Sequence, residues 1–350
     1  MADHPYKHLP ERSFWRQSVA NKSPFDLQAL YVKKFDIGSS DRIAAAGSCF
    51  AQHIARKLRA AGYNYLDCDP RPFNMSDEAA AKFGYDLYSA RFGNVYTARQ
   101  LLQLGQRALG GFKPLADSWE QGGRYFDPFR PTIEPDGFES AAEFQAAQKH
   151  HLHTVVQMLQ QADVFIFTLG LTEAWRDRRD GAVYPVAPGT AAGRFDPQIH
   201  EFHNFTHAEI LADLRAFIQL ARKLKPEMRF IFTVSPVPLV ATASDHHVLV
   251  ATTYSKSVLR AVAGELADTD PGIDYFPSYE VITGQPSRSM FYDPDLRSVN
   301  PAGVEVVMKH FFHQHRPLTD AAPNPQTSTF VNEADVVCDE MVLEAGRTGQ

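Results

Sequence analysis

Short apolar runs alternate with amphipathic stretches along most of the chain. Buried strands are predicted at residues 42–47, 164–169, 228–239 and 273–282, and a further strand, "GYNYLDCD", at 62–69. Apolar residues recur at helical spacing in residues 48–62, 141–162, 206–226, 247–268 and 300–316. Strands that alternate with helices of this length predict a parallel sheet of about five strands with helices on both faces.

The remaining segments predict additions to this α/β unit. Residues 1–40 are irregular and rich in aromatic residues and prolines, so we expect an arm that packs on a single domain at 41–316. Residues 70–140 are too long for a simple connection and predict an inserted, partly helical cap. Residues 176–205 are polar and predict loops, and residues 317–350 predict an acidic C-terminal tail.

Composition and charge indicate which classes of binding partner the protein is expected to have. The net charge of −6, without a basic run, argues against a nucleic-acid partner. No signal peptide or apolar span is visible, and Cys49, Cys68 and Cys338 form no CxxC pair, so a cytoplasmic protein without membrane contact is expected. The 14 histidines lack a completing ligand set and no phosphate loop is present, so no metal or cofactor is expected. A homo-oligomer remains open.

Ligands of such sheets bind at the carboxyl ends of the strands, where several polar residues stand in this chain. Ser48 follows the first strand and is either a nucleophile or the N-cap of the next helix. Its neighbour Cys49 is a rival nucleophile or a small buried side chain. Thr172 and Glu173 follow the third strand, as a turn cap and a solvated acid or as site residues.

The last two strand ends carry candidates for acid–base chemistry. His246 and His247 follow the fourth strand, and histidine is the commonest general base near neutral pH. Asp293 and Asp295 precede the final helix, where an acid could orient a histidine.

The stretch "AAAGSCFAQHIARKL" resembles the signature of the GSCFA family, which is named for this pentapeptide. Further stretches resemble blocks of the same family over roughly residues 5–315: "LPERSFWRQSV", "FGNVYTARQLLQL", "FTLGLTEAW", "TVSPVPL", "HVLVATTYSKSVLR", "DYFPSYEV" and "DLRSVNPAGVEVVM". The resemblance implies a place in the SGNH hydrolase superfamily of esterases, lipases, thioesterases and carbohydrate O-acyl enzymes. It therefore implies a flavodoxin-like α/β/α fold and a nucleophile at Ser48, between Gly47 and Cys49.

This chain departs from the superfamily pattern in two blocks. Where the pattern has GxND, with its asparagine as oxyanion donor, the chain has Gly170, Leu171, Thr172 and Glu173. The Thr172 hydroxyl, or Asn94 after Gly93 in "FGNVY", is expected to join the Ser48 N–H as donor. Where the pattern has DxxH, the chain has Asp295, Leu296, Arg297 and Ser298, so the expected histidine is missing.

Two interpretations of the missing histidine stay open. In the first, His247, or His246 beside it, is the base and Asp295 orients it, because triads are defined by geometry. In the second, hydrolysis has been lost and the pocket only binds its ligand. His53 is less favoured as the base, because it follows Ser48 by five positions and therefore lies on a different helical face. The expected function is an esterase acting on a small-molecule or saccharide acyl ester, with O-acyl transfer to a carbohydrate precursor, or ligand binding alone, as alternatives.

Overall fold

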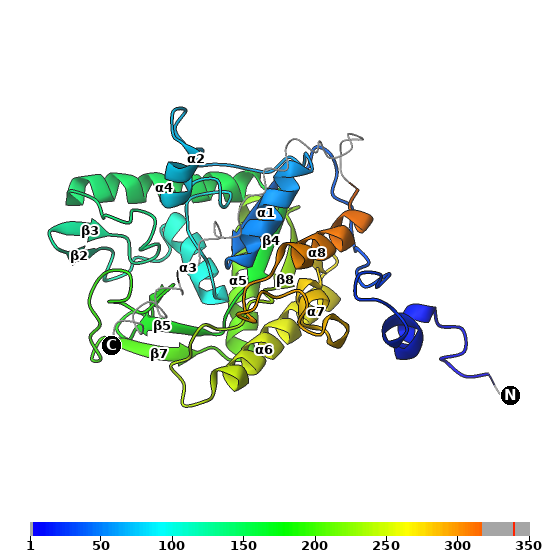
Figure 1. Ribbon diagram of the computed structural model, residues 1–350. Helices are drawn as coiled ribbons and strands as arrows, with labels where there is room; N and C mark the ends of the chain where they lie inside the picture. The colour runs from blue at the N-terminus through cyan, green and yellow to red at the C-terminus, as the bar shows by residue number, and fades with distance from the viewer. Residues whose placement is uncertain (1–2, 317–338, 340–350) are drawn as a thin grey trace.

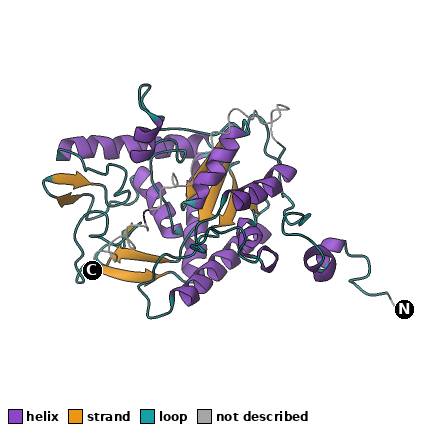
Figure 2. Ribbon diagram, viewed as in Figure 1, coloured by secondary structure: helices purple, strands orange, loops and turns teal. Residues whose placement is uncertain are grey.

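The computed structural model of the protein describes residues 3–316 and Asp339, and its centre is a parallel sheet (Figures 1 and 2). The strand order is β1-β4-β8-β9, with bounds Ile43–Gly47, Val164–Leu169, Arg229–Val234 and Ile273–Tyr275. All neighbouring pairs in this sheet are parallel. The predicted α/β class is therefore confirmed.

Within the described residues the sheet has four strands, where about five were expected. The second predicted strand is reduced to one parallel bridge between Tyr65 and Ile43 at the free edge of β1. Its two backbone bonds run from Ile43 N to Asn64 O (2.9 Å) and from Leu66 N to Ile43 O (2.8 Å). The chain then leaves the edge, because the next amide, Cys68 N, donates to Ser89 O in the inserted segment.

Side chains of the sheet alternate between two apolar layers, as the pleat requires. Ala44, Phe165 and Phe230 face one layer, whereas Ile43, Val164 and Ile231 face the other. The helices α3 (Ala98–Ala108), α4 (Ala141–Gln161), α5 (His207–Leu224) and α6 (Val248–Thr269) cover the first face. The second face is covered by α1 (Phe50–Ala60), α7 (Ser278–Thr283) and α8 (Pro301–Gln314), of which α1 and α8 lie in front in Figure 1.

The N-terminal segment joins the second layer through its last third. Two short helices, η1 (Glu11–Ser13) and η2 (Arg16–Ala20), precede it on the part of the chain that projects away in Figure 1. Tyr31 and Ile37 are buried in the second layer. The Tyr31 hydroxyl donates to Oδ2 of Asp274 in β9 (2.9 Å) and lies 3.0 Å from Nε2 of His315, which follows α8.

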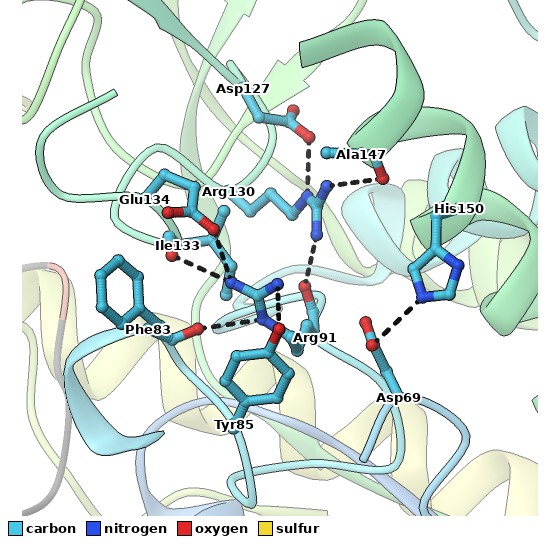
Figure 3. Close-up of polar contacts among 10 residues, drawn as sticks. All are labelled: Asp69, Phe83, Tyr85, Arg91, Asp127, Arg130, Ile133, Glu134, Ala147 and His150. Carbon is cyan, nitrogen blue, oxygen red and sulfur yellow. Dashed lines mark hydrogen bonds and ion pairs between the residues drawn. The ribbon is translucent and has the colours of Figure 1, made fainter. Parts of the chain in front are cut away.

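The long segment between residues 70 and 140 supplies α2 (Asp77–Lys82), α3 and a hairpin of β2 (Trp119–Gln121) and β3 (Arg124–Phe126). A buried ion pair fixes it, since Arg130 Nε donates to Asp127 Oδ2 at 2.7 Å (Figure 3). The same guanidinium donates to Arg91 O (3.0 Å) and to Ala147 O of α4 (3.4 Å). The inserted chain is thereby held against the first helical layer.

Two predicted elements differ from the structure. Residues 176–205, expected as loops, contribute to an antiparallel sheet of order β6-β5-β7, with bounds Val183–Tyr184, Glu173–Asp177 and His200–Asn204. Trp175 pairs with Tyr184 on one side and Phe202 on the other, and such aromatic cross-strand pairs stabilise a sheet in which many other residues are polar or charged. The run at 273–282 ends as a strand at Tyr275, and α7 follows Pro277.

Some sequence predictions concern residues that the structure does not describe. Cys338 and all of the tail except Asp339 lie outside them. No helix within them combines the length and apolarity that crossing a membrane requires.

Candidate functional site

Ser48 lies on the turn between β1 and α1 and is 3 % exposed. Cys49, itself buried, holds the N-cap position of α1, and no side chain caps this helix. Within the described part of the chain the Ser48 Oγ has no hydrogen-bond partner. The hydroxyl therefore does not act as a helix cap.

The turn depends on Gly47, whose φ is 147°. A Cβ at this position would lie 2.6 Å from the Thr168 carbonyl oxygen and 2.8 Å from its nitrogen, inside any real contact distance. The Ser48 N–H donates to the same carbonyl at 3.3 Å. The first predicted oxyanion donor is therefore engaged with β4 in this structure.

Residues 94–96 cross the ends of β1 and β4 beside Ser48. Val95 N donates to Gly47 O (2.9 Å), and the amides of Gly170 and Leu171 donate to Tyr96 O (3.1 and 2.9 Å). This crossing places Asn94 beside Ser48, although 46 positions separate them in the sequence.

The amide of Asn94 is buried and fixed in orientation. Its Oδ1 accepts from the Tyr88 hydroxyl at 2.5 Å and from Gln52 Nε2 at 3.3 Å, and the Tyr88 hydroxyl also lies 3.2 Å from Ser48 O. The Nδ2 group consequently points away from Tyr88. Gly93, predicted beside it, turns the chain with φ of 67°.

A residue that sequence reasoning missed completes this cluster. Asp339, 4 % exposed, accepts through Oδ2 from Asn94 Nδ2 at 2.9 Å and through Oδ1 from Thr132 Oγ1 at 2.6 Å. Its own N–H donates to the Tyr96 hydroxyl at 3.1 Å. Burial raises the pKa of this carboxyl. No motif in the surrounding sequence signals such a role.

Thr172 and Glu173 are both buried, so Glu173 is not the solvated acid that one interpretation expected. The Thr172 Oγ1 has no hydrogen-bond partner among the described residues, and its N–H donates to Ser255 Oγ at 3.1 Å. Glu173 accepts from Thr242 Oγ1 at 2.8 Å, and burial raises its pKa. Both residues thus offer polar groups at the end of β4.

Helix α6 contributes a lysine that the sequence analysis did not single out. Lys256 is 1 % exposed and donates from Nζ to Gly170 O at 2.7 Å. A Cβ on Gly170 would lie 3.0 Å from Ser48 Cβ, so this carbonyl belongs to a residue in close contact with Ser48. A signal for it exists in the sequence, because Lys256 falls at helical spacing with the apolar Leu259 and Ala263.

His247 and Asp295, the predicted base and its orienting acid, form no hydrogen bond with the Ser48 hydroxyl in this structure. Both are exposed, as is His246. His247 is the N-cap of α6, since its Nδ1 accepts from Leu249 N at 3.1 Å. Asp295 accepts instead from the Ser298 hydroxyl at 2.6 Å and from the N–H of Arg297 at 2.9 Å. The base assignment stays a prediction, and the contact that it needs is not formed here.

A cavity of about 210 Å³ opens at the same strand ends. Apolar side chains from β5, the segment after β6 and the loop after β8 dominate its lining, with the Glu173 carboxyl and Thr242 as polar groups. Leu171, which follows the glycine packed on Ser48, is part of the wall. In the described part of the chain, no group of three or more His, Cys, Asp or Glu side chains is placed to hold a metal ion.

Comparison with known proteins gives one family match. The model of the GSCFA family matches residues 42–311, a range that contains the whole central sheet, Ser48 and Asn94. No functionally curated protein matches the chain.

Several solved structures are similar at low identity. A carbohydrate esterase family 3 protein from Talaromyces cellulolyticus is 9% identical, with a TM-score of 0.37, over 77% of this chain and 94% of its own. An acetyl esterase is 9% identical, with a TM-score of 0.34, over 77% and 93%. A salicylyl-acyltransferase from a tetracycline biosynthetic pathway is 15% identical, with a TM-score of 0.27, over 46% and 40%.

Proposed function

The chain belongs to the GSCFA family, and from this premise we propose that it is an acyl-ester enzyme of SGNH type with Ser48 as nucleophile. One observation carries the proposal. The Ser48 hydroxyl stands at the carboxyl end of β1, caps no helix and has no hydrogen-bond partner among the described residues. A buried hydroxyl without a structural partner costs free energy, so a structural role accounts for it poorly.

The proposed reaction is an acyl transfer in two steps. The Ser48 Oγ bonds to the ester carbonyl carbon, and the alcohol leaves with a proton, so an acyl-enzyme forms. Water, or the hydroxyl of a saccharide acceptor, then takes the acyl group from Ser48. Esterase and O-acyltransferase activity therefore share the first step and differ only in the acceptor.

Two groups are suited to hold the oxyanion. The Asn94 Nδ2 carries two hydrogens, and its orientation is fixed by Tyr88 and Gln52. The Thr172 hydroxyl is buried and has no partner in the described part of the chain. Preorganised donors of this kind are worth about 10²–10³ in kcat.

We assign proton transfer to His247, or His246 beside it, as the sequence predicts. In the structure His247 is exposed at the start of α6, so this assignment requires the loop after β8 to bring it to Ser48 when substrate binds. Catalytic hydrogen bonds often tighten only in the substrate complex. His247→Ala should then lower acylation by about 10²-fold or more, whereas a histidine confined to capping would leave it unchanged.

A second candidate function is ligand binding without turnover. It is favoured by the absence, within the described residues, of a base hydrogen-bonded to Ser48. A series of nitrophenyl esters of increasing acyl length separates the two. Hydrolysis by wild type and Cys49→Ala, abolished in Ser48→Ala, supports the enzyme, and no turnover of any ester by folded wild type supports binding alone.

A further inference from the structure

The Asp339 carboxylate lies in a cluster of donors that includes the candidate oxyanion amide. We propose that the Asn94 amide and the Thr132 hydroxyl form a carboxylate-binding subsite, which Asp339 of the same chain fills until a carboxylate ligand replaces it. The inference rests on the proposed function, because it gives this part of the active site a ligand class.

The subsite has the contacts of a built anion site. Both carboxylate oxygens are used, one by the Asn94 amide at 2.9 Å and one by the Thr132 hydroxyl at 2.6 Å. The Tyr96 hydroxyl accepts from the Asp339 backbone at 3.1 Å and so fixes the approach of the carboxylate. The two donors are 38 positions apart in the sequence, and the fold of the inserted segment brings them together around one acid.

The side-chain amide of Asn94 is held in orientation by hydrogen bonds to its oxygen. Tyr88 and Gln52 donate to its oxygen, so its nitrogen must face Asp339. An amide pinned in this way donates well to any carboxylate in the same place, whether it belongs to the chain or to a ligand.

The donors around Asp339 are neutral, which makes its carboxylate replaceable. Among the described residues no Lys, Arg or His forms an ion pair with Asp339. Burial without a cation raises the pKa of the carboxyl, so keeping its anion in place costs free energy. A free carboxylate meets the same two donors, and it must overcome its own desolvation and displace Asp339.

Filling of the subsite by Asp339 opposes the proposed chemistry. A negative carboxylate on the Asn94 amide repels the negative charge that develops on the ester carbonyl oxygen beside Ser48. The carboxylic acid that ester hydrolysis releases belongs to the same chemical class as the Asp339 side chain. Asp339 is therefore an internal competitor for the place of the acyl carboxylate.

Acetate is the probe for the test, with binding measured by calorimetry and by chemical-shift titration in the Ser48→Ala background. If Asp339 fills the subsite in about nine of ten molecules, Asp339→Ala should bind acetate about tenfold more tightly than its parent. Adding Thr132→Val should remove most of this gain, because one of the donors is lost. Asp136→Ala, which removes an exposed carboxylate of the inserted segment, is the matched control and should leave the affinity unchanged.

Equal acetate affinity in the parent and in folded Asp339→Ala would overturn the inference. If the alanine variant unfolds, Asp339→Asn replaces it: this side chain keeps its shape but turns an NH2 group toward one of the two donors, so it should compete less well and acetate should again bind more tightly than in the parent. The binding experiment involves no chemistry at Ser48. Tighter acetate binding with an inert Ser48 would therefore leave the subsite standing and defeat the proposed function. A reactive Ser48 with unchanged acetate affinity would do the reverse.

Discussion

The turn that presents Ser48 depends on a backbone position that only glycine occupies without strain. Gly47 has φ of 147°, and its missing Cβ is what lets the chain pass the backbone of Thr168. The pattern of a short apolar run, a glycine and a helix predicted this turn and Ser48 with it. Asn94 was also predicted, but Tyr88, Gln52 and Asp339 were not, because contacts between distant segments leave no local spacing in the sequence.

Gly47→Ala should destabilise the protein by about 3 kcal/mol or more, since backbone strain of about 1–3 kcal/mol adds to overpacking of similar size. Gly122→Ala is the control, because Gly122 also has a positive φ (61°) but a Cβ added there would meet no atom within 4 Å. It should cost only the strain. Equal urea midpoints for the two variants would contradict the close-packing argument at the β1 turn.

The second prediction at the scale of residues is that activity depends on the Asn94 amide and on its orientation. Asn94→Ala should lower kcat/KM by about 10²-fold, as loss of one oxyanion donor does. Tyr88→Phe keeps the amide but removes its strongest anchor, so we expect a loss of about tenfold. Tyr85→Phe, which affects only the Arg91 network, should retain full activity. A fully active Asn94→Ala variant would exclude the amide as a donor.

At the scale of elements, burial and pairing explain where prediction succeeded. The runs at 42–47, 164–169 and 228–239 are rich in apolar residues on both faces, as a sheet between two helical layers requires. The first two form strands, and the third forms a strand only as far as Val234. Residues 62–69 lie at the edge of the sheet and form a single bridge to β1 in place of the predicted strand. The antiparallel sheet within 173–204 was missed because its aromatic pairs are set among charged residues.

The inserted segment depends on its buried ion pair more than on its exposed ones. Arg130→Met leaves the Asp127 carboxylate buried without its cation and should cost about 3–5 kcal/mol. Arg124→Met removes the exposed pair with Glu139 from the same segment and should cost less than about 1 kcal/mol. Unfolding in urea measures both. Similar losses of unfolding free energy in the two variants would show that the Arg130–Asp127 ion pair drawn in Figure 3 does not hold the segment.

At the scale of the whole molecule, Tyr31 joins the N-terminal segment to β9 and to the end of α8. The junction contains His315, whose pKa burial lowers to about 4, with the Lys33 charge as a further cause. A histidine that is neutral in the folded protein stabilises the fold above its unfolded pKa near 6.5, and this stability is lost as pH falls toward 4.

His315→Asn should therefore lose less stability than wild type on acidification from pH 6.5 to 4. The exposed His313 of α8 provides the control, and His313→Asn should follow the wild-type curve. Thermal unfolding at each pH measures the difference. Parallel curves for all three proteins would mean that the Tyr31 junction does not sense protonation.

The most direct test of the central claim is the reaction of folded protein with a fluorophosphonate, followed by mass spectrometric location of the adduct. We predict one adduct, on Ser48, that persists in Cys49→Ala and disappears in Ser48→Ala. Native protein that stays unlabelled, or an adduct on Cys49 instead, would contradict the assignment of Ser48 as the nucleophile.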